Sequence, residues 1–510
     1  MSAATMISVP KILDWLHANA PDAALVSDSR AIRNGDVFVA YPGDEADGRT
    51  YITDAIARGA RAVLHQAGGA ADDLQWDVPH YAVENLKAHA GEIAAAWYGH
   101  PDRAMLTVAV TGTNGKTSCT QWLGNALSRL GRPTAVVGTL GIGIFRDGRA
   151  GKFDATGYTT PDAVLLQREL ANLHRNGAVA LAIEASSIGL HQGRMSGMHV
   201  DTALFTNFTR DHLDYHGDMA AYEEAKAMLF DWPGLRHAII NLDDPMGLRL
   251  VQRLQQRVSS VAITGYSLVG HSVDGIALLH ATDVRSSQNG TLFQLESTCG
   301  GAAQIRTQLV GDFNVSNVLG IVGVLMANGV AWKDAIAVVE SLTAVSGRMQ
   351  QLGGNDAPLV VIDYAHTPDA LEKALSTLRN VAAERGGKLW CVFGCGGDRD
   401  QGKRPQMGKA SMAADHIILT TDNPRSEEPA DIIKQIIAGM TTAKSGVQII
   451  EDRAAAILSA IRNAGRQDVI LLAGKGHEAY QEIKGRKQPF LDADHATLAL
   501  SARAMQGGGS

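Results

Sequence analysis

The sequence predicts an α/β protein built from three domains. Residues 106–118 join an apolar strand to a glycine-rich turn, and a helix is predicted directly after it over residues 117–130. Between residues 359 and 473, five short apolar runs are each followed by a polar loop and a helical stretch, which predicts a doubly wound sheet. A chain of 510 residues is also too long for one hydrophobic core.

The first predicted domain, residues 1–102, precedes the glycine-rich turn. Short strands such as residues 37–41 and helical stretches such as residues 51–58 predict an α/β arrangement here as well.

The second predicted domain, residues 103–345, begins as a parallel α/β sheet. Its apolar strands are separated by helical or loop segments and end near Val110, Val137, Glu184, Phe205 and Asn241. Its later portion, about residues 258–310, is rich in strands and gives way to a helix over residues 315–328.

The third predicted domain, residues 346–510, repeats the strand and helix pattern. Its strands are expected at residues 359–363, 389–393, 416–421, 447–451 and 469–473. Ligands of open α/β sheets bind beyond the carboxyl ends of the strands, so polar residues at those ends are candidate site residues.

Composition narrows the class of protein. The net charge is −7 and no long basic tract is present, which argues against nucleic acid as the main partner. The first residues lack a secretion signal and no apolar run reaches membrane-spanning length, so a cytoplasmic protein without membrane insertion is expected. The four cysteines fit reduced thiols, and we interpret Cys391 and Cys395 as core thiols rather than metal ligands.

The glycine-rich turn predicts a site for a nucleoside triphosphate. Gly112 and Gly115 allow a sharp turn whose N–H groups point inward, Lys116 adds a positive charge, and Thr117 adds a hydroxyl suited to Mg²⁺. The generic phosphate loop has its first glycine two positions earlier, where this chain has Val110. The alternative is a glycine-rich turn with an incidental lysine.

Polar residues follow two further strands of the second domain. Glu184 suits Mg²⁺, although the turn after it is equally suited to capping a helix. His212 lies in a run of histidines and carboxylates at residues 210–216, which indicates a metal and phosphate site. Lys226 follows on a predicted helix and, taken alone, reads as a solvated surface lysine.

The third domain has its own strand-end candidates. Asp363 suits a ribose hydroxyl and His366 a phosphate, although both also fit a capped turn. The glycine-rich, basic loop at residues 394–404 suits anions, or its glycines only shape a tight loop. Pro424 stiffens the loop in which Arg425 offers a planar fork to a carboxylate, and the alternative is an ordinary Asx-Pro turn.

These motifs occur together in an order that resembles the Mur ligase family over nearly all of residues 20–495. The T-G-T-N-G-K-T turn, the S-D-S-R run at residues 27–30 and the D-N-P-R run at residues 422–425 carry this resemblance. It implies a domain that binds a UDP-linked substrate at residues 1–102, an ATP-binding domain at 103–345 and an amino-acid-binding domain at 346–510. It also implies a cytoplasmic ligase of peptidoglycan synthesis, and hence of cell wall biogenesis, cell shape and cell division.

The resemblance further implies roles for individual residues. ATP would bind to Gly112, Thr113, Asn114, Gly115, Lys116, Thr117, Ser118, Asn314, Arg348, Asp363 and His366. UDP-N-acetylmuramoyl-L-Ala-D-Glu would bind to Ser27, Ser29, Asp44, Glu45, Ala46, Tyr158, Thr159, Thr160, Ser186, Gln192 and Arg194. Meso-diaminopimelate would bind to Arg399, Asp422, Asn423, Pro424, Arg425, Gly474 and Glu478. Asp44-Glu45 and Tyr158 depart from the family's more frequent His-Gln and Asn.

The chemistry implied by the family is acyl activation. The catalytic residues would be Lys116, Lys226, Glu184 and His212, and Mg²⁺ would be held by Thr117, Glu184, His212 and Lys226. Lys226 would carry an N-carboxyl group from CO₂, which turns a cation into an anion. The substrate carboxylate would attack the ATP γ-phosphate, and the amine would then attack the acyl phosphate. The implied protein is a monomer.

Four alternatives stay open. A ligase that adds lysine, and one that adds D-Ala-D-Ala, are disfavoured by the D-N-P-R run, which the family associates with diaminopimelate. A folylpolyglutamate synthetase usually begins at the nucleotide domain and lacks the hundred-residue leader. A regulatory P-loop GTPase needs an N-K-x-D motif, which residues 241–244 do not form.

Overall fold

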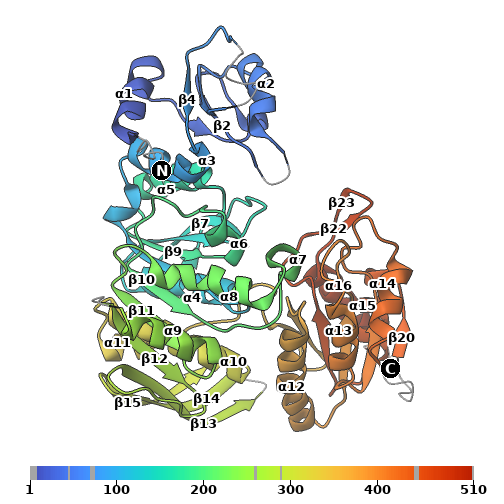
Figure 1. Cartoon of the computed structure of the whole chain (residues 1–510). Coiled ribbons are helices and arrows are strands. Elements are labelled where there is room, and N and C mark those ends of the chain that lie inside the picture. Colours follow the sequence, from blue (N-terminus) through green and yellow to red (C-terminus); the bar gives the residue numbers. More distant parts are fainter. Residues whose placement is uncertain are drawn as a thin grey trace. The chain divides into compact units, whose positions relative to one another are not determined.

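The computed structural model describes residues 8–43, 46–68, 75–257, 261–287, 290–440 and 447–507. Helices and mostly parallel strands build the chain, which confirms the α/β class (Figure 1). The chain divides into two compact units. Unit 1 comprises Met1–Thr111, Leu123–Leu204 and Glu224–Ala238, and unit 2 comprises Gly112–Trp122, Phe205–Glu223 and Ile239–Ser510. Within the described ranges, no helix is long and apolar enough to cross a membrane.

Unit 1 opens with a four-stranded parallel sheet. Its strands, in spatial order, are β1 Leu25–Val26, β2 Val37–Ala40, β3 Ala62–Gln66 and β4 His80–Val83, and its helices are α1 Val9–Asn19, α2 Ile52–Ala57 and α3 Leu86–Trp97. Successive residues of β2 point to opposite faces, so Val37 and Val39 join one buried cluster while Phe38 and Ala40 join the other. Both faces of the sheet are therefore covered.

Unit 1 also holds the sheet whose strand β5 leads to the glycine-rich turn, called the phosphate loop below. Its strands lie in the order β10 Thr202–Phe205, β5 Leu106–Thr111, β9 Ala180–Glu184, β6 Thr134–Gly138, β7 Gly141–Arg146 and β8 Arg149–Ala150, with helices α5 Ala163–Arg175 and α6 Ser187–His191. The expectation of a parallel sheet is correct for β5, β9 and β6, and the unpredicted strand β7 is antiparallel to β6. Only two residues separate Gly138 from its partner Gly141, and so short a loop forces a hairpin.

Unit 2 contains the strand-rich portion that the sequence predicts. Its strands are β12 Ala262–Ser267, β13 Ala277–Ser287, β14 Gly290–Ser297 and β15 Gly301–Thr307, and its helices are α9 Pro245–Gln255, α10 Asp312–Ala327 and α11 Trp332–Glu340. Strand β11 His237–Asn241 begins in unit 1 and ends in unit 2. Helix α10 starts three residues earlier than the sequence pattern indicates, because polar residues of its first turn hide the apolar period.

The last part of unit 2 is the predicted doubly wound sheet. Its order is β16 Gln350–Gly353, β17 Leu359–Asp363, β21 Val469–Ala473, β18 Leu389–Phe393, β19 His416–Leu419 and β20 Val447–Ile449, with helices α12 Pro368–Arg385, α13 Lys403–Ser411, α14 Pro429–Ile437, α15 Arg453–Asn463 and α16 Asp492–Gly507. All neighbouring strands of this sheet are parallel except the edge pair, β16 and β17, which is antiparallel.

One expectation for this sheet is wrong. A polar loop and then a helix are expected after each of the five strands, but β21 is followed by the hairpin of β22 Tyr480–Ile483 and β23 Arg486–Pro489 before α16 begins. Residues 480–489 are mostly polar and show no alternation of polar and apolar side chains that would indicate a strand. The hairpin matters below because it borders the site at the ends of β19 and β21.

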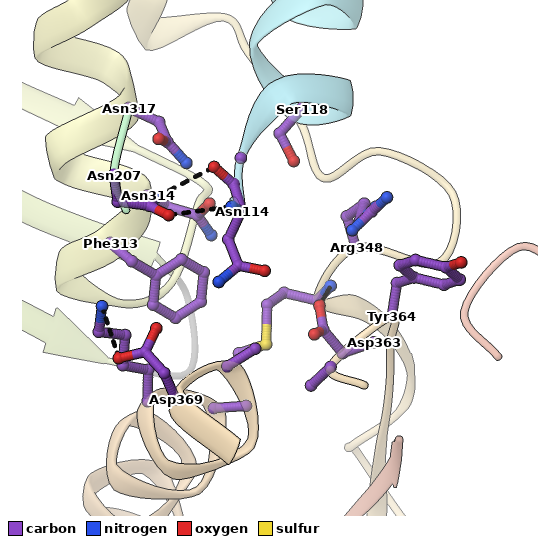
Figure 2. Close-up of a pocket in the computed structure, with 16 residues that line it drawn as sticks. Asn114, Ser118, Asn207, Phe313, Asn314, Asn317, Arg348, Asp363, Tyr364 and Asp369 are labelled. Atoms are coloured by element: carbon purple, nitrogen blue, oxygen red, sulfur yellow. Dashed lines mark hydrogen bonds and ion pairs between the residues drawn. The ribbon is translucent and has the colours of Figure 1, made fainter. Parts of the chain in front are cut away.

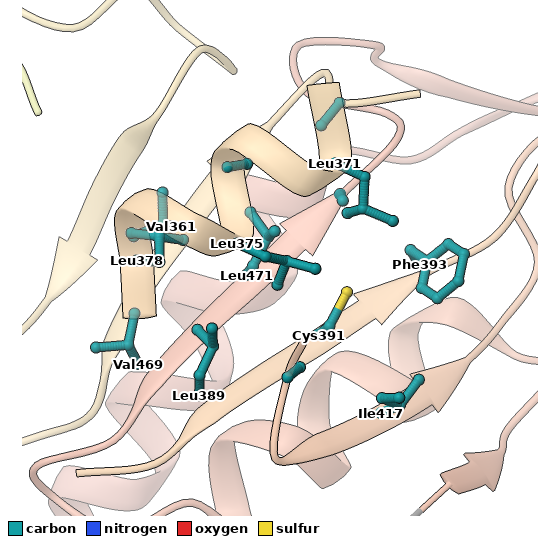
Figure 3. Packing of buried hydrophobic residues seen from close by; sticks show 14 of the residues in the cluster. Val361, Leu371, Leu375, Leu378, Leu389, Cys391, Phe393, Ile417, Val469 and Leu471 are labelled. Carbon is teal, nitrogen blue, oxygen red and sulfur yellow. The ribbon is translucent and has the colours of Figure 1, made fainter. Parts of the chain in front are cut away.

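The core on one face of this sheet packs against α12. Leu371, Leu375 and Leu378 of α12 lie over side chains of β17, β18 and β21 (Figure 3). Cys391 and Cys395 belong to the same buried cluster, and burial raises the pKa of both thiols above the ordinary value. The interpretation of these cysteines as core thiols is confirmed.

Leu375→Ala is expected to lower the free energy of unfolding by about 3 kcal/mol. Leu375 is fully buried, so truncation removes buried methyl groups and leaves a cavity that the packed sheet only partly fills. Urea denaturation of the variant measures this loss. Leu498→Ala is the matched control, because Leu498 is 69% exposed and its loss should change stability by less than about 0.5 kcal/mol. Equal effects of the two variants would contradict the assigned packing.

Candidate active site

The glycine-rich turn between β5 and α4 Lys116–Arg129 adopts a backbone that requires glycine. The φ angles of Gly112 and Gly115 are 148° and 90°. A Cβ atom on Gly112 would lie 1.9 Å from the Thr206 hydroxyl oxygen, and one on Gly115 would lie 2.8 Å from Asn317 Oδ1. Both the left-handed conformation and the lack of space exclude larger residues.

Asn207, at the end of β10, holds the turn in place. Its backbone carbonyl accepts a hydrogen bond from Thr113 N at 2.8 Å, and its Oδ1 accepts one from Asn114 N at 2.9 Å. Its Nδ2 donates to Asn114 O at 3.0 Å. The local sequence does not indicate this role for Asn207, apart from its place at the end of a strand.

Lys116 is oriented by the turn itself. Its Nζ donates to the carbonyls of Gly112 and Thr113 at 2.8 and 2.9 Å, so the ammonium is held beside the loop. The Thr113 hydroxyl donates to Thr209 O at 3.0 Å and lies 3.1 Å from the Tyr222 hydroxyl. A positive charge held beside an inward-facing loop suits a phosphate group.

A pocket opens beside this loop in unit 2 (Figure 2). Six of the residues predicted for nucleotide binding line it: Asn114, Gly115, Ser118, Asn314, Arg348 and Asp363. Its apolar and aromatic wall is not predicted from the sequence, and Phe313, Met349, Tyr364, Ala370 and Ala374 contribute to it. These residues come from α10, the residue before β16, the end of β17 and α12, so only folding brings them to the glycine-rich turn. An apolar wall near a phosphate loop suits a nucleoside.

Arg348 joins the pocket to the phosphate loop. Its Nη2 donates to the Thr117 hydroxyl at 3.1 Å, and its guanidinium carbon lies 4.5 Å from the centre of the Tyr364 ring. Asp363 Oδ2 accepts a hydrogen bond from Met349 N at 2.8 Å. Burial raises the pKa of Asp363 above its ordinary value, although the charge of Arg348 opposes the rise.

His212 and His366 meet at Asp211. His366 Nε2 lies 3.5 Å and His212 Nε2 lies 3.6 Å from Asp211 Oδ2, so two predicted site residues share one carboxylate. His366 is not among the residues that line the pocket of Figure 2. Burial opposes ionisation of Asp211, but the hydrogen bond from His366 and the nearby positive charges hold the pKa of this carboxyl well below its ordinary value.

Asp211→Asn is expected to remove stability in a pH-dependent way. Because the folded-state pKa lies below the unfolded value of about 3.9, ionised Asp211 stabilises the fold above about pH 5, and this contribution is lost as the pH falls below 4. Urea denaturation should show a loss of about 2 kcal/mol at pH 7 that shrinks toward pH 3. Asp356→Asn, with a side chain 89% exposed, is the control. A loss independent of pH would contradict this assignment.

A second polar site lies at the ends of β18, β19 and β21. Glu478 Oε2 accepts hydrogen bonds from Asn423 Nδ2 at 2.7 Å and from Lys475 Nζ at 3.2 Å. Lys475 is fully buried and also donates to Tyr480 O at 2.6 Å. Asn423 and Glu478 were predicted from the sequence, whereas Lys475 was not.

Arg425 lies at the same strand ends in a left-handed conformation, with φ 52°. Its Nη1 donates to Gly397 O at 2.6 Å, and its Nε lies 3.6 Å from Glu482 Oε2 on strand β22. Arg425 is half-buried, and Glu482 of the unpredicted hairpin already accompanies its guanidinium.

The other predicted residues of this site surround Arg425. A Cβ atom on Gly396 would lie 3.0 Å from Arg425 Nη1 and 3.8 Å from Arg399 Cγ, so the two arginines flank one glycine. Asp422 is buried and would meet a Cβ atom on Gly474 at 2.5 Å, which keeps position 474 a glycine. The buried Pro424 completes the loop. The structure therefore brings the seven residues predicted for amino-acid binding to one edge of the sheet.

Unit 1 gathers many of the residues predicted for the UDP-linked substrate. The Thr160 hydroxyl donates to Glu184 O at 2.7 Å and lies 2.9 Å from the Ser186 hydroxyl, which caps α6. Arg194 donates to Thr160 O at 2.9 Å and to Gln192 Oε1 at 2.7 Å, and its guanidinium lies 5.1 Å from the centre of the exposed Tyr158 ring.

The residues predicted for the UDP-linked substrate before position 102 make contacts of their own. The Ser27 hydroxyl donates to Asp162 Oδ1 at 2.8 Å, beside the start of α5, and Ser29 lies in the short helix after it. Ala46 O accepts from Gly43 N at 2.8 Å, while the predicted Asp44 and Glu45 lie outside the described residues.

The predicted metal ligands are divided between the units. Thr117 and His212 belong to unit 2, whereas Glu184 and Lys226 belong to unit 1. Glu184 is buried and accepts hydrogen bonds from Thr139 N at 2.8 Å and from the Thr139 hydroxyl at 3.1 Å. The part of the chain that the structure describes has no group of three or more His, Cys, Asp or Glu side chains placed to hold a metal ion.

Lys226 is not the surface lysine that its local sequence suggests. It lies on α8 Met219–Ala227 and is only 1% exposed. A buried lysine is costly unless its charge is balanced or removed, and this position is therefore compatible with the predicted modification. The presence of the modification stays a prediction.

Known proteins match the chain over its whole length. Family models match residues 24–98 (Mur ligase family, catalytic domain), 110–325 (Mur ligase middle domain) and 347–476 (Mur ligase, glutamate ligase domain). A relative from Janthinobacterium sp. (strain Marseille), named UDP-N-acetylmuramoyl-L-alanyl-D-glutamate--2,6-diaminopimelate ligase, is 73% identical over 99% of this chain and 100% of its own.

Two further comparisons agree. A relative of the same name from Ralstonia nicotianae is 52% identical over 97% of this chain and 96% of its own. A solved structure of a protein with that name is 34% identical, with a TM-score of 0.65 over 96% of this chain and 99% of its own. The phosphate loop, the pocket beside it and the polar site at the strand ends thus occur in a chain that belongs to the Mur ligase family.

Proposed function

We propose that this chain is an ATP-dependent ligase that adds meso-2,6-diaminopimelate to the D-Glu γ-carboxylate of UDP-N-acetylmuramoyl-L-Ala-D-Glu, in peptidoglycan precursor synthesis. The observation that carries the proposal is the pair of sites in unit 2. One site joins a phosphate loop to an apolar pocket. The other places Arg425 and Glu478, a group for a carboxylate and a group for an ammonium, at one sheet edge.

The names of the relatives support the same reaction. Two relatives at 73% and 52% identity are named as ligases of diaminopimelate, and this chain keeps the D-N-P-R run at residues 422–425. We propose domain boundaries at residues 1–102, 103–345 and 346–510, for UDP-linked substrate, ATP and amino acid respectively. We also propose a cytoplasmic, monomeric protein that serves cell wall biogenesis, cell shape and cell division.

The proposed reaction begins with transfer of the ATP γ-phosphate to the substrate carboxylate. Two anions must meet, and Lys116, held by Gly112 O and Thr113 O, neutralises charge as the phosphoryl group moves. The amine then attacks the acyl carbon and phosphate leaves. Asp363 and Asn314 would hold the nucleoside, with His366 near the phosphates.

Hydroxyl and carboxylate oxygens are ligands that Mg²⁺ prefers, and the proposed ligand set includes both. Thr117, His212, Glu184 and a carboxylated Lys226 would hold the ion, which would supply positive charge at the triphosphate. The Thr117 hydroxyl accepts a hydrogen bond from Arg348, and its second lone pair would be available to the ion. Carboxylation by CO₂ would turn the Lys226 ammonium into an anion, which would give the set a second negative charge in addition to that of Glu184.

The proposed substrate site in unit 1 uses hydroxyls and one arginine. Thr159, Thr160, Ser186 and Arg194 would bind the muramoyl dipeptide, and Ser27 and Ser29 the UDP end. The contacts among Thr160, Ser186 and Arg194 support this, because a preformed polar cluster orients its donors before the substrate arrives. Asp44, Glu45 and Ala46 would add contacts at the UDP end.

The proposal is tested by phosphate release and product mass. The protein is incubated with ATP, Mg²⁺ and UDP-N-acetylmuramoyl-L-Ala-D-Glu, and meso-diaminopimelate is compared with L-lysine. Product only with diaminopimelate supports the proposal. Preference for lysine keeps the ligase and overturns the role of the Arg425 loop, and no product with either amine overturns the proposed reaction.

A further inference from the structure

Tyr364 lies between the two sites of unit 2. It follows Asp363 at the end of β17, and Figure 2 shows its ring beside the Arg348 guanidinium at the edge of the nucleotide pocket. The ring centre is 4.5 Å from the guanidinium carbon. On its other side, the Tyr364 hydroxyl donates a hydrogen bond to Glu478 Oε1 at 3.4 Å. One side chain therefore contacts a residue of each site.

The first contact supports the nucleotide site. Arg348 reaches the phosphate loop through its hydrogen bond to the Thr117 hydroxyl at 3.1 Å. A guanidinium over an aromatic face is held by the ring's negative face, which limits the directions in which Arg348 can point. The ring of Tyr364 thus restricts the arginine that touches the loop.

The second contact supports the amine site. Glu478 receives three donors: Asn423 and Lys475 on Oε2 and Tyr364 on Oε1. Burial, together with the charge of Glu478, raises the pKa of Tyr364, so the phenol keeps its proton and acts as the donor. Without this bond, Oε1 loses the contact that sets its direction.

The loops around Tyr364 are tightly packed against each other. A Cβ atom on Gly347 would lie 2.1 Å from His477 N, so the backbone before Arg348 packs directly on the backbone before Glu478. The His477 ring lies 5.3 Å from the Tyr364 ring. Burial and the charges of Arg348 and Lys475 lower the pKa of His477 to about 3, so its ring is neutral at pH 7. This packing holds the two loops at a set spacing across Tyr364.

We infer that Tyr364 is a positioning residue for amine selection, which orients Glu478 through its hydroxyl while its ring supports Arg348 beside the phosphate loop. The inference rests on the proposed function, in which Glu478 receives the distal ammonium of diaminopimelate. It assigns separate tasks to two parts of one side chain. The hydroxyl serves the amine site and the ring serves the nucleotide site.

Tyr364→Phe and Tyr364→Leu separate these tasks. The phenylalanine variant keeps the ring, so the KM for meso-diaminopimelate should rise about tenfold while the KM for ATP changes less than about twofold. The leucine variant also removes the ring, so the KM for ATP should rise as well. An equal rise of both KM values in Tyr364→Phe overturns the inference.

A double-mutant cycle shows whether Tyr364 acts through Glu478. In a Glu478→Gln background, Tyr364→Phe should change the KM for diaminopimelate less than about twofold, because the oriented carboxylate is already gone. The same tenfold rise in both backgrounds overturns the inference. Tyr266→Phe is the matched stability control. Its buried hydroxyl donates to Phe205 O at 2.8 Å, and its loss should lower the melting temperature without changing either KM.

The wild-type protein is assayed in parallel. An inactive wild type overturns the proposed function and the inference with it. With an active wild type, the KM values of the variants bear on Tyr364 alone, and the proposed reaction stands whichever way they fall.

Discussion

Replacing Lys116 with alanine is expected to lower kcat about 1,000-fold. Gly112 O and Thr113 O hold the Lys116 ammonium beside the glycine-rich turn, so its positive charge lies next to the proposed phosphate site. Removing one such oriented charge typically costs 100-fold to 1,000-fold in rate. The KM for ATP should rise far less, because the loop backbone and the apolar pocket remain. Phosphate release at saturating substrates measures the change.

Lys409→Ala is the control for this experiment. Lys409 is an exposed lysine of α13, and its loss should leave kcat within about twofold of wild type. Thermal denaturation of both variants checks that the fold is retained. A kcat for Lys116→Ala within about tenfold of wild type would show that Lys116 is incidental to the turn.

Arg425→Ala is expected to lower kcat/KM for meso-diaminopimelate about 100-fold and to leave the KM for ATP unchanged. The planar guanidinium suits the second carboxylate of diaminopimelate, and losing one partner of a charge-assisted pair costs several kcal/mol when the pair is desolvated. The loss should be smaller than for a fully buried arginine, because Glu482 already accompanies Arg425 and competes with the substrate. Steady-state kinetics with each amine measures the effect.

Two further variants sharpen this prediction. Arg425→Lys keeps the positive charge but loses the planar fork of N–H donors. Its kcat/KM for meso-diaminopimelate should therefore lie between those of the wild type and Arg425→Ala. Arg466→Ala removes an arginine that is 62% exposed and should change nothing measurable. Equal losses for diaminopimelate and ATP in Arg425→Ala would assign Arg425 to the fold rather than to the amine.

The local patterns of the sequence were sufficient for the main elements. The strand before Gly112, the helix after Gly115 and the strands of the doubly wound sheet are where apolar runs and glycines indicate them. Such runs report directly on burial, since both faces of a parallel sheet are covered. The hairpins β6–β7 and β22–β23 were not predicted, because their short strands lack a clear period.

The residues of the candidate site also fall into two groups, those that the local sequence predicts and those that it does not. The sequence by itself determined the glycine-rich turn, because the conformation of Gly112 and Gly115 and the chemistry of Lys116 and Thr117 are local properties of a few adjacent residues. It also placed Asp363, Asn423, Arg425 and Glu478 at strand ends, where parallel topology gathers them.

Only the tertiary structure decided which of these groups meet. Three contacts join residues that are far apart in the chain. Asn207 bonds the glycine-rich turn, Glu482 accompanies Arg425, and Tyr364 links Arg348 to Glu478. Likewise, Lys226 is buried, although its local sequence indicates a solvated surface lysine. Local patterns report the backbone and the buried faces of each element. The pairing of side chains depends on how separate strand ends are packed together, which no short stretch of sequence contains.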